Sequence, residues 1–291
     1  MTTETSLAFI GGGVMGEAMI RGLLDKGIVP AARIAVTGPR AERRDELSKR
    51  FGIRAVAENA AAAAGASVVV LSVKPQVLPA VMRELRATLR PDQLVLSIVA
   101  GATMHALTTG LGHAAVVRAM PNTPAQVGMG VTAWYAAPAV SAEQRATART
   151  LLEALGEQIA VDDESHVDMA TALSGTGPTY VFLLMEAMVD AGVHLGFSRR
   201  VAEELVLRTV EGSALFARQS GRHLAELRNM VTSPGGTSAA AIYQLEKGSL
   251  RTVLSKAIHA AHERTVALGA ETERRVSEGE VEDEDGADDR R

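Results

Sequence analysis

A glycine-rich turn near the N-terminus is the first feature whose residue types could bind a ligand. Gly11, Gly13 and Gly16 follow the apolar run 7–10, and helix-forming residues begin at Val14. An apolar strand, a tight turn and a helix start in this order are typical of dinucleotide-binding units. Gly11 would permit the sharp turn, Gly13 would let a diphosphate approach the backbone, and Gly16 would let the helix lie against the strand. The free N–H groups and the positive dipole end of the helix would then face the phosphates.

The residues after the next predicted strand bear on the choice of cofactor. Residues 34–37 read as a strand, which ends at Thr37 without the Asp or Glu that NAD enzymes usually place there. Arg40 follows instead, and Arg43 and Arg44 lie just beyond it. Because an arginine without a neighbouring carboxylate attracts a 2′-phosphate, the sequence favours NADPH, with NADH still usable. Arg43 and Arg44 could equally cover an exposed helix.

Two polar, glycine-rich stretches, residues 173–180 and 231–238, interrupt helical segments in the C-terminal part. Each combines hydroxyl side chains, exposed backbone N–H groups and a helix start, which together suit a small carboxylate. The alternative is that both are helix–helix turns with capping hydroxyls. Two such stretches in one small domain favour binding over that alternative.

The strand pattern predicts how these residues are positioned. Continuous apolar runs, typical of strands covered on both faces, alternate with helix-like stretches. The strand runs are 68–73, 94–98 and 115–120, and the helical stretches are 41–51, 76–89 and 103–111. This alternation predicts an α/β Rossmann-type domain with a doubly wound parallel sheet. A further strand pair, about 130–136 and 158–161, flanks a helix at 142–155 and would complete the domain.

Residues at the carboxyl ends of these strands would line the ligand crevice. Val73, Lys74 and Pro75 end one apolar run, and the loop 120–124 follows another. The polar groups of that loop, Asn122 among them, would lie near the nicotinamide.

Strand-like runs disappear beyond Asp162, and helical periodicity replaces them. The sequence predicts helices over 178–195, 198–219 and 249–268, with Gly269 as a natural stop. Most of the circumference of the first helix is apolar, so we expect two subunits to bury these helices against each other as a homodimer. The expected division is a Rossmann domain over 1–163, an all-α dimerisation domain over 164–270 and a tail over 271–291.

Composition narrows the classes of protein that remain. The 291 residues carry a net charge of −4 and contain no cysteine, which excludes disulfides, thiolate metal sites and a cysteine nucleophile. Residues 271–291 hold ten acidic and four basic residues, and almost no apolar ones. This composition predicts a disordered tail, so that a chain ending at Ala270 would keep its activity and melting temperature. No run approaches the roughly 20 apolar residues of a membrane span, and the N-terminus has no signal-peptide pattern. We therefore expect a cytoplasmic protein without membrane or nucleic-acid partners.

Four motifs make the sequence similar to a known family. They are residues 73–76 (VKPQ), 118–124 (RAMPNTP), 173–180 (LSGTGPTY) and 231–238 (VTSPGGTS), the last being highly specific. In this order they resemble the pyrroline-5-carboxylate reductases, and the similarity extends from Phe9 to about Leu268. The resemblance implies NAD(P)H-dependent reduction of the imine of 1-pyrroline-5-carboxylate to L-proline, the last step of proline biosynthesis. It also implies a Rossmann domain followed by an all-helical dimerisation domain, with assemblies up to a decamer of dimers.

The resemblance also assigns residues to the substrate and the cofactor. The substrate carboxylate would lie in a loop formed by Ser233, Gly235, Gly236, Thr237 and Ser238, in a site completed across the dimer interface. Asn59 matches a cofactor-contacting asparagine of the family. Together with the residues discussed above, the predicted cofactor-binding set is Gly11, Gly13, Val14, Met15, Gly16, Thr37, Arg40, Asn59, Val73, Lys74, Pro75 and Asn122.

The predicted catalytic residues are Ser238 and Thr237. An imine carbon accepts hydride best when its nitrogen is protonated, and a neutral hydroxyl at Ser238 could hydrogen-bond and orient that nitrogen. The family loop commonly ends Gly-Gly-Thr-Thr or Gly-Gly-Ala-Thr, so Ser238 keeps the hydroxyl and loses a methyl group. Leu224 stands where a proline is usual, at a predicted helix start.

Three alternatives are weighed against this hypothesis. Hydroxyacid and 6-phosphogluconate-type dehydrogenases need a catalytic lysine after the domain boundary, and the chain has none between Lys74 and Lys247. A non-catalytic NADP(H)-binding sensor would have no need for the loop 233–238. A reductase of a related cyclic imine acid stays open. No metal site is predicted, because His259 and His262 have no matching ligand set.

Overall fold

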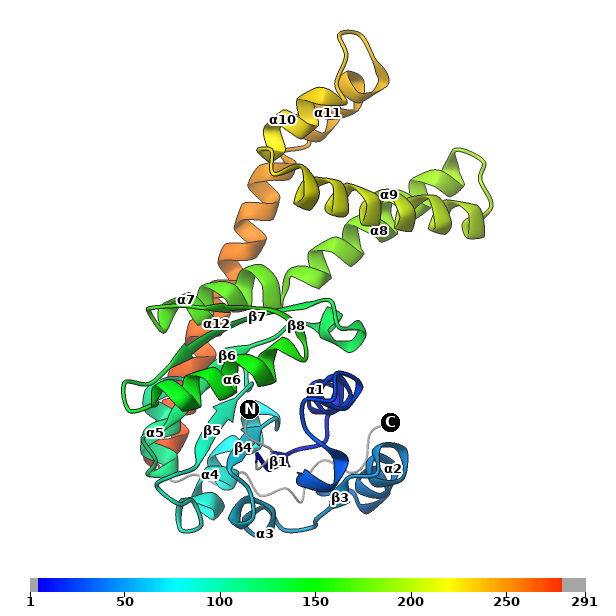
Figure 1. Ribbon diagram of the computed structural model, residues 1–291. Coiled ribbons are helices and arrows are strands. Elements are labelled where there is room, and N and C mark those ends of the chain that lie inside the picture. Colours follow the sequence, from blue (N-terminus) through cyan, green and yellow to red (C-terminus); the bar gives the residue numbers. More distant parts are fainter. Residues whose placement is uncertain (1–4, 279–291) are drawn as a thin grey trace, which may run out of the picture. The chain divides into compact units, whose positions relative to one another are not determined.

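The computed structural model describes residues 5–278, which form two compact units (Figure 1). The α/β unit contains the described residues up to Thr176 and those from Ala261 onward. The helical unit is Gly177–Ala260. This division differs from the expected one, because residues 164–176 and 261–270 pack with the α/β unit rather than with the helices between them.

The α/β unit is built on one eight-stranded sheet in the order β3-β2-β1-β4-β5-β6-β7-β8. The strands are β1 Leu7–Ile10, β2 Ile34–Val36, β3 Arg54–Ala55, β4 Val68–Leu71, β5 Leu94–Ser97, β6 Val116–Met120, β7 Gly130–Ala136 and β8 Gly156–Ala160. β1, β4 and β5 lie where continuous apolar runs predicted strands. All three are buried along their whole length. The strand order reverses at β1, which pairs with β2 on one side and β4 on the other. Ligand crevices of such sheets lie at the carboxyl ends of the strands beside this reversal.

The sheet is mixed rather than fully parallel, which corrects the sequence-based expectation. β7 pairs with β6 in antiparallel register, with Met120 opposite Ala133, whereas β8 is parallel to β7. The connection between β6 and β7, residues 121–129, is shorter than the roughly dozen residues that a parallel crossover needs. The chain therefore has to return in the opposite direction.

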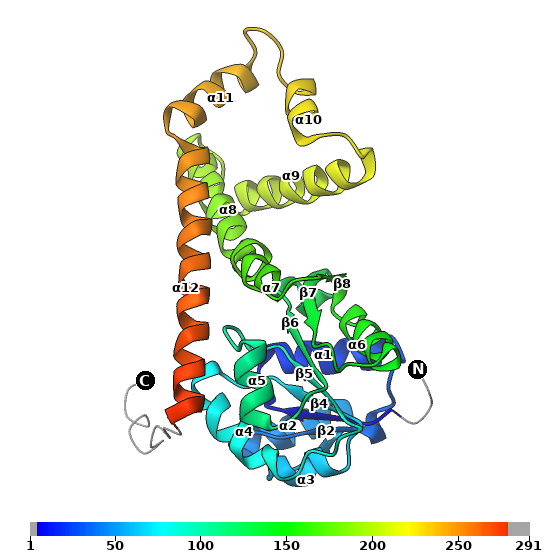
Figure 2. The same ribbon diagram turned by 90° about the vertical axis from the view of Figure 1, so that its left-hand side faces the viewer.

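The helices of the α/β unit pack around this sheet (Figures 1 and 2). They are α1 Val14–Asp25, α2 Ala41–Phe51, α3 Asn59–Ala64, α4 Leu78–Arg86, α5 Met104–Leu111, α6 Ala142–Glu153 and α7 Ser165–Ala170. The predicted bounds of α2 are confirmed, and Ser141 caps α6 with a complete capping box. The stretch predicted as one helix over 76–89 is instead the 3₁₀ turn η2 Pro75–Val77 followed by α4. No helix within residues 5–278 is long and apolar enough to cross a membrane.

The polar stretch that begins at residue 173 is helical rather than a loop, and its predicted role in anion binding stays a prediction. Residues Thr171–Gly175 form a π-helical turn, η4, that continues directly from α7. The hydroxyls of Ser174 and Thr176 donate to the carbonyls of Ala170 and Thr171, both at 2.9 Å. Because these hydroxyls bond to the helix backbone, they are engaged in holding the turn. Wide turns of this kind recur at functional sites.

The last helix, α12 Leu250–Glu278, continues past the predicted stop at Gly269. Gly269 and Thr272 are buried, and a Cβ on Gly269 would come within 3.0 Å of the Thr103 side chain. Thr103 donates a hydrogen bond to Glu273 at 2.6 Å, and Val276 packs against the main core. Figure 2 shows this end of α12 beside α5. Residues 271–278 are thus an ordered part of the α/β unit, and the rest of the expected tail, 279–291, lies outside the described residues.

A chain that ends at Ala270 is now expected to be less stable than the full chain. It loses the buried Thr272, the Val276 packing and the hydrogen bond between Thr103 and Glu273, together worth about 1–3 kcal/mol. A chain that ends at Glu278 keeps all three and serves as the matched control. Melting temperatures of the three proteins check this expectation. Equal melting temperatures for both truncations would show that these contacts contribute nothing.

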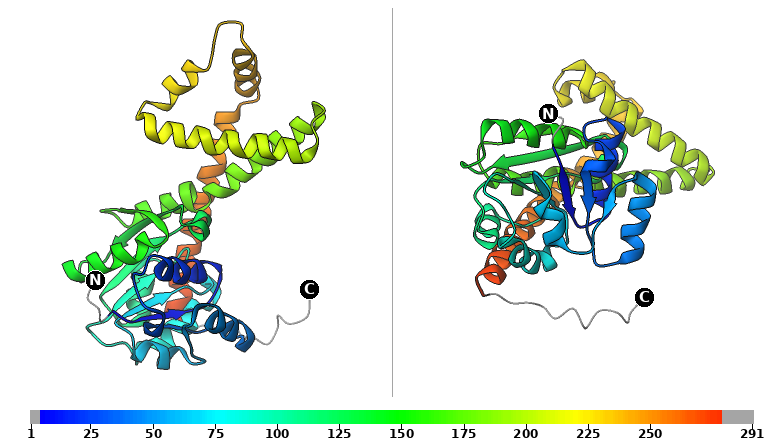
Figure 3. Two further views of the ribbon diagram at one scale, coloured as in Figure 1. Left: turned by 45° about the vertical axis from the view of Figure 1, so that its right-hand side comes forward. Right: turned by 60° about the horizontal axis from the view of Figure 1, so that its bottom comes forward.

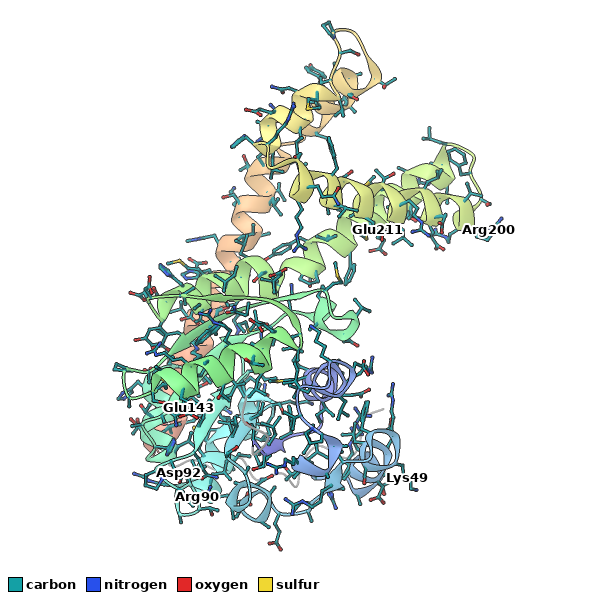
Figure 4. The ribbon with its side chains drawn as sticks, in the orientation of Figure 1. Lys49, Arg90, Asp92, Glu143, Arg200 and Glu211 are labelled. Atoms are coloured by element: carbon teal, nitrogen blue, oxygen red, sulfur yellow. The ribbon has the colours of Figure 1, made fainter. Side chains whose placement is uncertain are left out.

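The helical unit buries very little of its own apolar surface. It contains α8 Gly177–His194, α9 Arg199–Ser220, α10 Leu224–Met230, α11 Thr237–Lys247 and the first part of α12. Its described core is Val189, Ala202 and Val206, where α8 and α9 lie side by side (Figure 3). Charged side chains such as Arg200 and Glu211 extend from α9 (Figure 4). Large apolar side chains are nevertheless exposed on several helices, among them Phe182 at 59%, Leu183 at 65% and Tyr243 at 63%. Helices with so much exposed apolar surface are typical of subunit interfaces.

Candidate cofactor and substrate sites

The turn after β1 requires glycine at two positions for steric reasons. Gly11 has a φ of +103°, and a Cβ on it would stand 2.7 Å from the Ser72 carbonyl oxygen. A Cβ on Gly16 would stand 2.9 Å from the Gly11 carbonyl oxygen. The first glycine therefore lets β1 pass close to the end of β4, and the second lets α1 pack on the turn.

The N-terminus of α1 presents unpaired backbone donors. Gly13 is the N-cap and offers no side chain, and the first intrahelical bond runs from the Glu17 N–H to the Gly13 carbonyl at 2.9 Å. The N–H groups of Val14, Met15 and Gly16 consequently have no partner among the described residues. Three N–H groups at the positive end of a helix dipole suit a pyrophosphate.

Three cofactor candidates meet at the carboxyl ends of β1 and β2. Thr37 is buried, and its hydroxyl donates to Asn59 Oδ1 at 2.6 Å. The same hydroxyl oxygen accepts the Gly11 N–H at 3.4 Å. The structure thus brings together Gly11, Thr37 and Asn59, which are far apart in the sequence.

The three arginines after β2 have different environments. Arg43 donates to the Gly12 carbonyl at 3.1 Å and pairs with Glu17 and Glu46. Arg44 donates to the carbonyls of Gly38 and Pro39. Arg40 is exposed, and its guanidinium has no partner within residues 5–278. Arg43 and Arg44 therefore hold the loop, whereas Arg40 alone of the three has no side-chain partner among the described residues.

Glu17 is the acidic centre of this region, on the first turn of α1. Burial alone would raise the pKa of its carboxyl, but hydrogen bonds from Arg43 and Arg21 and the charge of Arg50 outweigh burial and lower that pKa. A lowered folded-state pKa stabilises the fold above the unfolded value near 4.5, and this contribution is lost as the pH falls through the folded value. At neutral pH Glu17 is therefore an anion that retains Arg43 beside the turn.

The remaining cofactor candidates lie at the ends of β4 and β6. Val73, Lys74 and Pro75 follow β4, where Lys74 is exposed and Pro75 opens η2. Asn122 is already engaged by the protein: its Nδ2 donates to the Ser174 carbonyl at 3.2 Å, and its Oδ1 accepts the Val131 N–H at 2.9 Å. The Asn122 amide therefore ties the loop after β6 to β7 and η4.

The predicted substrate loop lies in the helical unit and ends at the start of α11. Gly235 has a φ of +69°, and Gly236 is the N-cap, with its N–H donating to the Ser233 carbonyl at 3.1 Å. The first intrahelical bond is from Ala240 to Gly236, so the N–H groups of residues 237–239 have no partner among the described residues. The hydroxyls of Thr237 and Ser238 are likewise without a hydrogen bond within residues 5–278. This helix start therefore offers free donors to an anion, although the Gly236 N–H, included in the sequence-based expectation, is already used.

A buried ion-pair network was not predicted from the sequence. Arg118, only 2% exposed on β6, pairs with Glu164 at 2.6 Å and with Asp168. Glu164 also accepts the Met104 N–H at 2.6 Å. These bonds fix α7 to β6 and to the start of α5, which explains why residues 164–176 belong to the α/β unit. The available signal was a single arginine within an otherwise apolar strand run.

Two surface pockets lie at the amino ends of the strands, opposite the ends that carry the candidate cofactor residues. One, of about 310 Å³, is lined by the first residues of β1, β2 and β3 (Leu7, Ile34 and Arg54). The other, of about 430 Å³, is lined by the first residues of β4 and β5 (Val68 and Leu94). Both are at the amino ends of the strands, so neither coincides with the candidate cofactor residues at the carboxyl ends.

The fold and the glycine turn together define a Rossmann-type, dinucleotide-dependent oxidoreductase with an additional helical unit. Residues 6–101 match the family described as NADP oxidoreductase coenzyme F420-dependent, and residues 164–268 match the family described as pyrroline-5-carboxylate reductase dimerisation. The chain belongs to the pyrroline-5-carboxylate reductase family. Its match to a dimerisation domain indicates a homo-oligomer, in agreement with the exposed apolar helices of the helical unit.

Close relatives support this assignment over nearly the whole chain. The pyrroline-5-carboxylate reductase of Pseudomonas aeruginosa is 46% identical, over 90% of this chain and 96% of that protein. The enzyme of Escherichia coli is 35% identical, over 91% of this chain and 98% of that protein. Among solved structures, the Coxiella burnetii reductase has a TM-score of 0.84 at 38% identity and covers 91% of this chain and 98% of its own. The Plasmodium falciparum pyrroline carboxylate reductase with NADP bound has a TM-score of 0.85 at 30% identity, with 92% and 100% coverage.

Proposed function

We propose that this chain reduces the imine of 1-pyrroline-5-carboxylate to L-proline with NADPH as the hydride donor. The observation that carries the proposal is the start of α11 in a chain of this family: three backbone N–H groups and two hydroxyls beside Gly236 have no hydrogen-bond partner within residues 5–278. Such a group of donors suits a carboxylate next to a nitrogen that needs orientation. The reaction also requires a site for the dinucleotide, which the glycine turn after β1 would supply.

Different residues would bind the cofactor NADPH and the imine substrate. The N–H groups of Val14, Met15 and Gly16 hold the pyrophosphate, and Arg40 meets the 2′-phosphate. Thr37, Asn59, residues 73–75 and Asn122 line the remaining cofactor site at the strand ends. On the substrate side, the residues of the loop 233–238 hold the carboxylate.

Bound NADPH would supply the hydride for the imine carbon, and the proton on the ring nitrogen would complete the amine. Ser238 donates or accepts a hydrogen bond at that nitrogen and so fixes the ring orientation, while Thr237 assists at the carboxylate. Orientation against the nicotinamide is the main contribution of the protein, because the cofactor supplies the reducing chemistry.

The assembly is also part of the proposal. The exposed apolar helices support a homodimer formed through the helical unit, with each active site completed by the partner chain. Larger rings, up to a decamer of dimers, would build on that dimer. Light scattering coupled to gel filtration checks this, since the mass must be an even multiple of that of the 30.5 kDa chain, and a monomer would contradict it. A cytoplasmic location is proposed as well, supported by the lack of cysteines that secreted domains use in disulfides.

The activity is tested by following NADPH absorbance with 1-pyrroline-5-carboxylate and identifying proline as the product. The same assay with a six-membered imine acid tests for a related cyclic substrate, and a repeat with NADH tests cofactor choice. We expect the five-membered imine and NADPH to give the highest kcat/KM. NADPH binding without turnover of either imine would support the non-catalytic sensor. A higher kcat/KM with the six-membered imine acid would identify that compound as the substrate instead.

A further inference from the structure

A chain of hydrogen bonds runs from the glycine turn to a surface helix that no motif singles out. It begins at the Gly11 N–H, passes through the Thr37 hydroxyl and reaches Asn59 Oδ1. Asn59 Nδ2 then donates to Glu84 Oε2 on α4 at 2.8 Å. The other oxygen of Glu84, Oε1, accepts the Ala60 N–H at 3.2 Å. One carboxylate thus holds both the side chain of Asn59 and the first turn of α3.

The carboxylate determines the direction of the two side-chain bonds that Asn59 makes in this chain. An ionised Glu84 can only accept, so Asn59 must turn its NH₂ group toward α4 and its carbonyl oxygen toward Thr37. Thr37 must then donate to Asn59, which leaves its oxygen free to accept the Gly11 N–H. A neutral amide at position 84 would remove this constraint, because it could present a donor or an acceptor.

The chain ends where the cofactor's adenosine ribose belongs. Thr37 follows the last residue of β2, and the end of this strand is the position that contacts the ribose in dinucleotide-binding sheets. Asn59 is half-buried beside it and keeps one N–H and one lone pair unused within the described residues. The orientation of its amide therefore decides which of these two groups faces the ribose.

We propose that Glu84 is a positioning residue for the cofactor, which fixes the Asn59 amide in the orientation that receives the adenosine ribose. This rests on the proposed use of NADPH. Glu84 itself needs no contact with the cofactor, and it acts through Asn59 and through the Thr37–Gly11 link to the turn.

The first test compares Glu84→Gln with Glu58→Gln. Glu58 is the exposed residue that precedes α3, and its side chain makes no hydrogen bond within residues 5–278, so its replacement removes the same charge without breaking the chain. Titration of the full-length protein with NADPH and with NADH, in the absence of substrate, gives Kd for both cofactors. We expect Glu84→Gln to raise both values by roughly 3- to 10-fold, and Glu58→Gln to change neither by more than about 2-fold. In turnover, KM for the cofactor should rise more than kcat falls.

A second variant separates positioning from simple support of the fold. In the double exchange Asn59→Asp with Glu84→Gln, the amide at 84 donates to the carboxylate at 59 and still accepts the Ala60 N–H, so every bond of the chain is restored. We expect the double variant to regain any melting temperature that Glu84→Gln loses, while its Kd for NADPH stays raised, because Asp at position 59 has no N–H to offer the ribose and its charge repels the 2′-phosphate.

Several outcomes would overturn the positioning role. An unchanged Kd in Glu84→Gln would do so, and so would tighter NADPH binding with unchanged NADH binding, because that pattern reports only removal of a negative charge. Recovery of both melting temperature and Kd in the double variant would reduce Glu84 to a structural role. The wild-type titration and the proline assay test the proposed function separately from the role of Glu84. A wild-type chain that binds neither cofactor overturns the proposed function together with this inference.

Discussion

Replacing Arg40 by alanine is expected to weaken NADPH binding by roughly 10- to 150-fold and to change NADH binding by no more than about 2-fold. The reason is that a charge-assisted contact to the 2′-phosphate is worth about 1.5–3 kcal/mol, and NADH has no such phosphate. Of the three arginines after β2, only Arg40 is without a protein partner in the described part of the chain, whereas Arg43 and Arg44 are held by Glu17 and by loop carbonyls. Direct titration with both cofactors measures the effect.

Arg33→Ala is a matched control for this prediction. Arg33 lies immediately before β2 and Arg40 lies beyond its other end, so the two variants remove the same charge from opposite edges of the sheet. Arg33→Ala should leave the ratio of the two Kd values unchanged. Equal weakening of NADPH and NADH by Arg40→Ala would discard Arg40 as the residue that discriminates between the cofactors.

Replacing Ser238 by alanine is expected to lower kcat/KM for 1-pyrroline-5-carboxylate by roughly 5- to 30-fold, or about 1–2 kcal/mol. The structure places Ser238 in the first turn of α11, two residues beyond Gly236, the N-cap position that a capping side chain would need. Its hydroxyl makes no hydrogen bond to the protein within residues 5–278, so it is free for the ring nitrogen. Steady-state kinetics and a melting curve on the same preparation measure both possible roles.

Ser238→Thr supplies the matched control, because it keeps the hydroxyl and adds only a methyl group. It should retain most of the activity, and the Kd for NADPH should stay unchanged in both variants. A purely structural role predicts the reverse pattern, in which alanine lowers the melting temperature and turnover is nearly normal. A stable Ser238→Ala enzyme with unchanged kcat/KM would rule out the contact to the substrate.

Local signals were sufficient for the parts of the chain where one physical requirement dominates. β1, β4 and β5 are continuous apolar runs because both faces of the sheet are covered, and this pattern is visible in any short window. The glycines of the turn are equally local, since Gly11 must adopt a positive φ and Gly16 must allow close packing. The type of fold and the dinucleotide turn therefore followed from the residues alone.

Other features depended on contacts between distant residues. Gly269 ordinarily ends a helix, yet α12 continues because Thr103 and the surface around α5 pack against it and Glu273 finds a donor there. The composition of residues 271–278 is that of a solvated tail, and it gave no indication of these partners. The helical form of residues 171–175 was missed for the same reason, because the hydroxyls of Ser174 and Thr176 bond to backbone carbonyls of the turn.

By itself, the sequence determined that the chain has a strand–glycine turn–helix unit, a helical C-terminal part and the loop 233–238, because each is written in consecutive residues with one dominant requirement. Only the tertiary structure decided which of three neighbouring arginines has no partner among the described residues, which way β7 runs and that Glu84 contacts Asn59. Those outcomes depend on which partner a side chain meets, as when Glu84 contacts Asn59, 25 positions away, or on the length of a connection, and a side chain's type does not reveal its partner.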